Sequence, residues 1–195
     1  MADNHPATPP ISATASSFTF AQVAVSIAES IIVSFPTRDE LLARGTMDER
    51  AVTDLYDLWV VAHEEAMELA VRLPEIFGNP PRPRITLHVA RGYDDEWTLT
   101  ESRVAELSAM DPEQHWMDVS LESTRCFQEY FSFSDPEGCR FYLPAFIRYY
   151  LADFPLSYWD AVHFACGNRL HFDLITPEQL SFVDEFLRLC RTWES

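Results

Sequence analysis

The segment YFSFSDPEGCRFYLPAF, residues 130–146, brings aromatic side chains, two acids, an arginine and a turn signal closer together than any other part of the chain. Its central DPEG, residues 135–138, predicts a tight turn, because Asp suits the first position of a turn and Pro the second. Arg140 is the natural partner of either acid, since a guanidinium can bind both oxygens of a carboxylate. Pro144 suits the first turn of a helix over about residues 143–151. We therefore expect a structural turn that the aromatic residues pack against the core.

Outward from this segment, the chain shows start signals typical of helices. In a capping box, a Ser or Thr and a Glu or Gln three residues later each satisfy a free backbone amide of the other. Such boxes, or a single capping residue, occur at Thr37, Thr46, Thr98, Ser120 and Thr176. They predict a short helix over about residues 38–44, the longest helix up to Pro74, and a closing helix that begins at Pro177.

Two places break the helical pattern. Apolar and polar residues alternate over residues 85–89, which predicts a half-buried strand with His88 on the face away from the core, near the acids of residues 94–96. Residues 162–164 and 170–172 either pair as two short strands or form a loop. The fold class that follows is mainly α, a single-domain helical fold of about six to eight helices with at most a small two- or three-strand β element.

The first residues differ in composition from the rest of the chain. Residues 1–17 are rich in Pro, Ala, Ser and Thr, which predicts a disordered N-terminal tail. No repeat or linker divides the remainder, and a length of 195 residues suits one domain. Residues 18–195 therefore predict a single globular domain. Within it, residues 18–73 form a helical extension, opened by an apolar helix near Phe20, and residues 74–195 form the core.

The charge balance excludes several kinds of chemistry. The chain has 31 acids against 14 bases, a net charge of −17, and all of its bases are arginine. Without lysine there is no P-loop phosphate lysine, no Schiff-base nucleophile and no pyridoxal phosphate anchor. The acidity also argues against nucleic acid as a partner, because such binding neutralises phosphates with basic side chains. A basic protein is the more natural partner, although acidity that serves solubility alone remains an open alternative.

Cysteine usage and hydropathy indicate a reducing compartment and no membrane. A zinc site built from Cys139, His163, Cys166 and His171 fits no standard spacing, and small buried thiols are the simpler interpretation. The apolar run of residues 20–35 follows no basic residue and contains an acid, which excludes a signal peptide, and it is too short and polar to span a bilayer. We expect a cytoplasmic protein without a cofactor.

Three segments resemble one family. They are FSDPEGCRFYLPAF (residues 133–146), RPRITLHVARGYDDEW (82–97) and DLITPEQLSFVDEFL (173–187). The first is similar to the hallmark F-x-D-x-E-G-x-R-F-Y-L-P-A, matched by residues 133–145, of a bacterial family of small proteins of unknown function. The other two are similar to its acid-rich segment and its closing helix. The resemblance covers about residues 74–195 and implies no catalytic residues.

The candidate functional surface combines the hallmark with the acid-rich segment. It consists of His88, Asp94, Asp95, Asp135, Glu137, Arg140 and Tyr142. If these residues meet in space, His88 and the carboxylates could hold a divalent cation or perform acid–base chemistry. In the alternative interpretation the same residues only stabilise the turn. The motifs G-x-S-x-G, G-x-G-x-x-G and H-E-x-x-H are absent, so the sequence gives no support for an enzyme.

Three functional hypotheses remain open from the sequence. The first is a non-enzymatic acidic binding or regulatory module that engages a basic protein, as an immunity protein or an inhibitor does. The second is a small metal-dependent or acid–base hydrolase that uses Asp95, Asp135, Glu137 and His88 around the DPEG turn. The third is a structural homo-oligomer, and the sequence does not determine the oligomeric state.

Overall fold

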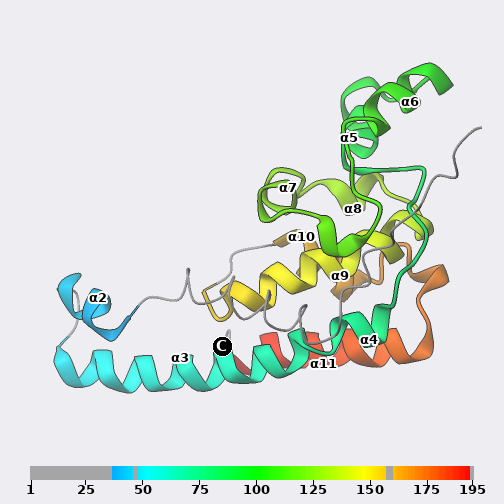
Figure 1. The fold of residues 1–195 in the computed structure, drawn as a ribbon. Coiled ribbons are helices and arrows are strands. Elements are labelled where there is room, and N and C mark those ends of the chain that lie inside the picture. The colour runs from blue at the N-terminus through cyan, green and yellow to red at the C-terminus, as the bar shows by residue number, and fades with distance from the viewer. Residues whose placement is uncertain (1–36, 46–47, 157–159, 194–195) are drawn as a thin grey trace, which may run out of the picture.

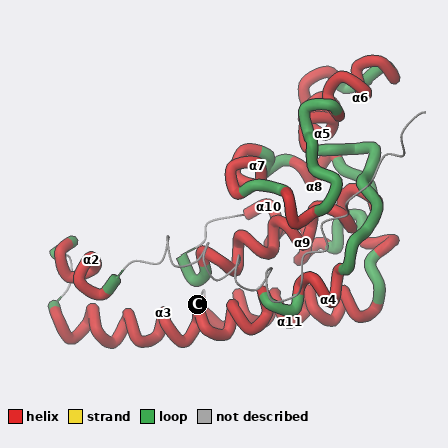
Figure 2. Tube along the Cα trace, viewed as in Figure 1, coloured by secondary structure: helices red, strands yellow, loops and turns green. Residues whose placement is uncertain are grey.

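The computed structural model describes residues 37–45, 48–156 and 160–193. The predicted tail of residues 1–17 and the predicted helix near Phe20 lie outside these ranges. Helices joined by turns and loops make up the described residues, and Figure 2 shows no strand among them. The prediction of a mainly helical fold is therefore confirmed, whereas no β element occurs in the part of the chain that the structure describes.

Three long helices organise the molecule. Helix α3 (Glu49–Ala70) and the closing helix α11 (Pro177–Trp193) run side by side, and α9 (Pro136–Asp153) packs on α3 (Figure 1). Helix α9 is buried over most of its circumference, because the shorter α4 (Leu73–Phe77) and α10 (Asp160–Asn168) also pack on it. The largest fully buried side chains of the core include Tyr130, Phe131, Phe141, Tyr142, Phe146, Phe182 and Phe186. The aromatic segment of residues 130–146 is thus the centre of the fold.

The DPEG segment begins a helix instead of forming a separate turn. Asp135 is the N-cap of α9, where its carboxylate accepts the backbone amide of Gly138 at 2.7 Å, and Pro136 is the first helical residue. Asp followed by Pro suits a helix start as well as it suits a turn, because both need a side-chain acceptor and a fixed φ. The helix therefore begins at Pro136 and not near residue 143.

Pro144 consequently lies inside α9 and not in its first turn. Its ring removes the amide that would bond to the carbonyl of Arg140, a change that costs about 3 kcal/mol in a helix interior. The buried aromatic residues on both sides of Pro144 offset this cost, since each contributes roughly 1.5–3 kcal/mol by leaving water. Tertiary packing therefore overrides the local preference of proline.

Residues 85–89 do not form the predicted strand. Helix α5 spans Leu87–Glu96 and α6 spans Glu101–Ser108. The two helices pack on each other and form a lobe, residues 87–108, that projects from the rest of the molecule in Figure 1. This lobe has a small hydrophobic core of its own, made by Val89, Val104 and Leu107.

The alternation that suggested a strand arises because α5 is buried on two sides. Leu87 and Ala90 belong to the main core, whereas Val89 belongs to the core of the lobe. A helix between two cores places apolar residues on opposite faces, and over five residues this resembles the period of a strand.

Short elements connect the long helices. They are α2 (Arg38–Ala43), the 3₁₀ helix η1 (Trp116–Asp118), α7 (Leu121–Cys126), α8 (Tyr130–Phe133) and the 3₁₀ helix η2 (Phe172–Leu174). The described residues thus contain more helices than the six to eight predicted, because several of them are only one or two turns long. Residues 162–164 lie within α10, and residues 170–172 lead from a turn into η2, so the strand pair is wrong.

Several helix starts that the capping residues predicted are found in the structure. The capping boxes of Thr37 with Glu40 and of Thr176 with Gln179 are confirmed, as is Ser120 as the N-cap of α7. Two starts are displaced. Helix α3 is capped by Asp48, and Thr46 lies outside the described residues. Helix α6 is capped by Thr100 instead of Thr98. Near the other end of α3, Pro74 lies in the first turn of α4.

None of the described helices is long and apolar enough to cross a membrane. The described part of α3 contributes Ala62, Ala66, Leu69 and Ala70 to the main core. The division of the domain at residue 73 stays a prediction.

Candidate functional site

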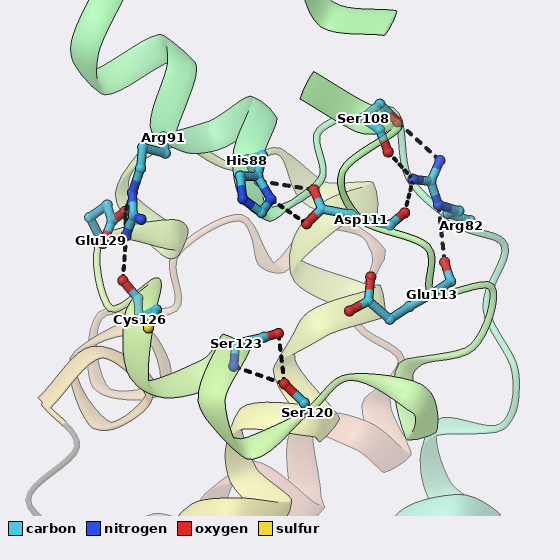
Figure 3. Close-up of polar contacts among 10 residues, drawn as sticks. All are labelled: Arg82, His88, Arg91, Ser108, Asp111, Glu113, Ser120, Ser123, Cys126 and Glu129. Carbon is cyan, nitrogen blue, oxygen red and sulfur yellow. Dashed lines mark hydrogen bonds and ion pairs between the residues drawn. The ribbon is translucent and has the colours of Figure 1, made fainter. Parts of the chain in front are cut away.

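A cluster of polar side chains lies where the lobe meets the rest of the molecule (Figure 3). Its centre is Asp111, which is only 4% exposed. One carboxylate oxygen of Asp111 accepts the backbone amide of His88 at 2.9 Å, and the other lies 2.6 Å from Nδ1 of the same histidine. Thr86, the N-cap of α5, makes no capping bond with its own side chain. Asp111 therefore caps α5 from 23 residues further along the chain.

Arg82 holds the loop that carries Asp111. Its guanidinium donates to the carbonyl oxygens of Ser108, Asp111 and Glu113 at 2.8, 2.7 and 3.0 Å, and to the hydroxyl of Ser108 at 3.1 Å. A planar guanidinium presents its donors in a fixed fork, which suits several acceptors around one loop. Arg82 thus binds mainly the backbone of this loop, and it fixes the positions from which the side chains of Asp111 and Glu113 project.

Glu113 and Tyr142 bring two further polar groups to the cluster. Burial raises the pKa of Glu113, whereas a hydrogen bond from its own backbone amide lowers it. The negative charge of Asp111 raises the pKa further, and Arg82 and His88 lower it by smaller amounts. Burial also raises the pKa of the Tyr142 hydroxyl, with Asp111 and Glu113 as the next causes. Oε2 of Glu113 and the hydroxyl of Tyr142 are buried without a hydrogen-bond partner. The amide of Leu87 lowers the pKa of Tyr142, although their geometry falls short of a hydrogen bond.

On the other side of His88, a stack of side chains fixes the imidazole ring. The ring of Phe127 contacts that of His88 edge to face at 4.7 Å between centroids. The guanidinium of Arg91 lies over Phe127, 3.9 Å from the ring centroid, and donates to Glu129 at 2.7 Å and to the carbonyl of Cys126. The imidazole is thereby held from two directions, by Asp111 at Nδ1 and by the ring of Phe127.

The structure brings together two of the seven residues of the candidate surface. His88 lies in the first turn of α5, and Tyr142 lies in α9 near its partners in the cluster. Asp94 and Asp95 are exposed near the opposite end of α5. The sequence alone did not predict that Asp111, Glu113 and Arg82 would join His88. In the sequence Asp111 is followed by Pro112, a pair typical of turns, and nothing local points to its contact with His88.

The three remaining residues belong to the start of α9. Asp135 caps the helix, and Glu137 is exposed in its first turn. The expected pairing of Arg140 is wrong, because Arg140 forms no ion pair with either acid and its buried Nε has no hydrogen-bond partner. One oxygen of Asp135 instead accepts the backbone amide of Gly138, and Glu137 projects into water.

A second surface lies on the exposed side of α3, and we call it the acidic face. It consists of Asp54, Asp57, Leu58, Val61, Glu64, Glu65 and Glu68. These residues recur at intervals of three and four, so they lie along one side of the helix, and the residues that α3 buries lie on another side. Two of them are large apolar residues in contact with water: Leu58 is 54% exposed and Val61 is 45% exposed.

The acidic face continues into a groove between α3 and α11. The groove has a volume of about 480 Å³, and its walls include Glu65, Glu68, Glu185 and Arg188. Arg72 and Glu185 form an ion pair across it at 2.6 Å, and this contact lowers the pKa of Glu185. The indole of Trp193 donates to Glu65 at 2.9 Å.

Most of the arginines are committed to contacts within the chain. Ion pairs with acids hold Arg38, Arg50, Arg72, Arg84, Arg91, Arg103, Arg125 and Arg169. Arg82 and Arg148 instead donate to backbone carbonyls. Because acids outnumber bases by 31 to 14, many carboxylates remain without a basic neighbour.

The part of the chain that the structure describes gives no support for a metal site. Among the described residues, no group of three or more His, Cys, Asp and Glu side chains could hold a metal ion. Cys139, Cys166 and Cys190 are buried as expected, whereas Cys126 is exposed. Burial raises the pKa of Cys139 to about 12, which opposes the thiolate form that metals bind.

Comparison with other proteins identifies a family but no function. No curated protein and no solved structure matches the chain. One family model matches residues 65–191, which are more than half of the chain and include α9, the lobe and the polar cluster. The chain therefore belongs to the family described as "Family of unknown function (DUF6714)".

Proposed function

We propose that this protein is a non-enzymatic binding or regulatory module that engages a basic protein through the acidic face of α3, as an inhibitor or an immunity protein does. The observation that supports this proposal most directly is the contrast between paired arginines and unpaired acids. Asp57, Glu64 and Glu68 of the acidic face form no ion pair with any described residue, and all three are exposed. Their charges are therefore available to a partner.

The apolar residues of the acidic face add affinity that charge alone does not supply. Leu58 and Val61 stand between the acids, one helical turn apart. Covering their exposed parts would contribute about 1 kcal/mol each, since full burial of such a side chain contributes roughly 1.5–3 kcal/mol. Carboxylates around an apolar centre match a partner that presents Lys or Arg around apolar residues of its own.

A second copy of this chain is a poor occupant of the same face. In a two-fold dimer the same patch meets itself, so the five acids of one copy would lie against the five acids of the other. With a net charge of −17 on each chain, this contact is repulsive. The charges therefore favour a basic partner over self-association.

The proposal can be tested by affinity capture with two matched triple variants. The face variant is Asp57→Asn, Glu64→Gln and Glu68→Gln, and the control variant is Asp94→Asn, Asp95→Asn and Glu137→Gln. Both remove three exposed acids, but only the first changes the acidic face. We expect the wild type and the control variant to retain a protein of basic isoelectric point from host lysate at about 50 mM salt. The face variant should lose it, and so should the wild type at about 500 mM salt.

Two results would contradict the proposal. One is that the wild type retains no basic protein under the low-salt condition, as judged by mass spectrometry of the bound fraction. The other is that the control variant loses the partner while the face variant keeps it, which would move the binding surface to the lobe and the start of α9.

A further inference from the structure

The groove between α3 and α11 is bounded at both ends by contacts between the two helices (Figure 1). At one end Arg72 bonds to Glu185 at 2.6 Å, and at the other the indole of Trp193 donates to Glu65 at 2.9 Å. The residue numbers rise along α3 as they fall along α11, so the two helices run antiparallel here. Glu65 and Arg72 are two helical turns apart on α3, which separates the two contacts by about 10 Å. The groove, with its volume of about 480 Å³, therefore has two defined ends.

Part of the lining of the groove is apolar. Leu69 of α3 and Leu189 of α11 line it, and both belong to the main core. Long basic side chains bury their methylene groups on such apolar surfaces while their charged ends stay near water or a carboxylate. The groove therefore offers a surface for the stem of a basic side chain, with polar residues around it for the charged end.

The two walls of the groove differ in how their charges are used. On the side of α11, the hydrogen bond from Arg72 lowers the pKa of Glu185, and the charge of Arg188 lowers it further. On the side of α3, Glu68 is exposed and forms no ion pair with any described residue. At Glu65 only Oε2 accepts a bond from a described residue, the indole at the end of the groove. The carboxylates of the α3 wall are therefore available to a cation.

We propose that the groove binds the side chain of an arginine, with its methylene groups on the two leucines and its guanidinium donating to Glu65 and Glu68. Two carboxylates three residues apart on a helix are neighbours, so the planar fork of one guanidinium can bond to both. The ammonium group of lysine is a compact point charge and suits two separate acceptors less well. This inference rests on the proposed function, and it names the residue of the basic partner that is recognised where the acidic face meets α11.

The charges that line the groove favour one basic side chain over an anion or a run of bases. The lining contains three acids, Glu65, Glu68 and Glu185, and two bases, Arg72 and Arg188. The acids are in excess by one charge, which a single arginine would balance. An anion would increase the excess of negative charge, and a second cation would meet Arg188. The charges therefore fit an arginine whose neighbours in the partner are uncharged.

The first experiment titrates the full chain with the peptide acetyl-Gly-Arg-Gly-amide and with counterparts that carry lysine or the uncharged citrulline in place of arginine. The indole N–H signal of Trp193 in nitrogen-15 NMR reports on the groove, because this group is bonded to Glu65, and Trp193→Phe identifies the signal. We expect a saturable shift with the arginine peptide and an affinity at least about threefold lower for the lysine peptide. The citrulline peptide should give no saturable shift. Lysine or citrulline bound as tightly as arginine would overturn the proposal.

Two substitutions in the groove should change the affinity for the arginine peptide in opposite directions. Glu68→Gln should weaken binding by about fivefold, the upper end for an exposed ion pair, whereas Arg188→Gln should strengthen it by about twofold because a like charge is removed. Glu178→Gln is the control, since Glu178 is an exposed acid in the first turn of α11, outside the groove. Weaker binding by Arg188→Gln would indicate an anionic ligand and overturn the proposal. So would an equal effect of Glu68→Gln and Glu178→Gln.

A capture experiment separates this inference from the proposed function. Thr192→Phe narrows the groove without changing a charge, and Ser181→Phe makes a similar change at an exposed position of α11 outside the groove. At low salt we expect Thr192→Phe to lose the basic protein and Ser181→Phe to keep it, with the melting temperature showing that both are folded. If Thr192→Phe keeps a protein that the face variant loses, the groove assignment is wrong and the proposed function stands. If the wild type retains no basic protein, the proposed function is wrong, whereas the peptide titration still decides whether the groove binds arginine.

Discussion

The two hydrophobic cores of this molecule are stabilised in different ways. The main core packs many large aromatic side chains around α9, whereas the core of the lobe contains only Val89, Val104 and Leu107. The lobe compensates with polar contacts to the rest of the molecule, among them Asp111 with His88 and the guanidinium of Arg91, which donates to Glu129 at 2.7 Å. Apolar burial in the main core is spread over many side chains, whereas the attachment of the lobe depends on a few specific polar contacts. One substitution can therefore remove a large share of what holds the lobe, but only a small share of what holds the main core.

The largest loss of stability is expected from a cavity in the main core. Phe146 is fully buried, and its ring lies 4.9 Å from that of Phe131. Phe146→Ala should lower the free energy of unfolding by about 3–5 kcal/mol, because the lost contacts leave a cavity that the surrounding rings cannot fill. Urea denaturation measures this change. Phe164→Ala is the control, since Phe164 is 57% exposed and its loss should have little effect. A loss below about 1 kcal/mol for Phe146→Ala would contradict the assignment of the main core.

A smaller loss of stability, confined to the lobe, is expected when the contact between Asp111 and His88 is removed. Asp111→Ala removes the cap of α5 and leaves the amide of His88 and its ring without their acceptor. We expect a loss of about 2 kcal/mol, which is a roughly 30-fold drop in hydrogen-exchange protection, confined to α5 and α6. The amides of α9 should keep their protection. Asp94→Ala, an exposed acid on the same helix, should change neither region. Equal loosening of α9 and the lobe would show that the two cores unfold as one unit.

The smallest effect is a dependence of stability on pH through Glu113. Because the folded protein holds the pKa of Glu113 above its ordinary value of 4.5, folding favours the protonated carboxyl group. The contribution of Glu113 is therefore fully present below pH 4.5 and decreases as pH rises through the folded pKa. Glu113→Gln should gain in melting temperature relative to the wild type as pH rises from 4 to 7. A difference that stays constant across this range would contradict the burial of Glu113.

The sequence predicted elements whose signals are local. The boxes at Thr37 and Thr176 were correct because both partners lie within one turn of the same helix. The closing helix was correctly predicted to begin at Pro177, because a proline at the first helical position is a signal that needs no distant partner.

The predictions from the sequence that were wrong share one physical cause, which is contact with a distant part of the chain. The alternation over residues 85–89 reflects two cores on either side of α5, and only one of them is close in sequence. Pro144 is tolerated inside α9 because the helix is buried on almost all sides. Asp111 and Glu113 were absent from the candidate surface because their relation to His88 depends on how the loop folds back.

The cap that Asp111 gives to α5 also sets an order of events during synthesis. Helix α5 cannot gain this cap while the ribosome is still adding the residues between His88 and Asp111. At about 5–20 residues per second, this interval lasts roughly one to five seconds. Throughout it, the nascent α5 is a ten-residue helix, shorter than the ~12–15 residues that isolated helices need to be even marginally stable in water. The lobe is therefore completed as a unit only after its last loop has left the ribosome, although its first helix is made well before.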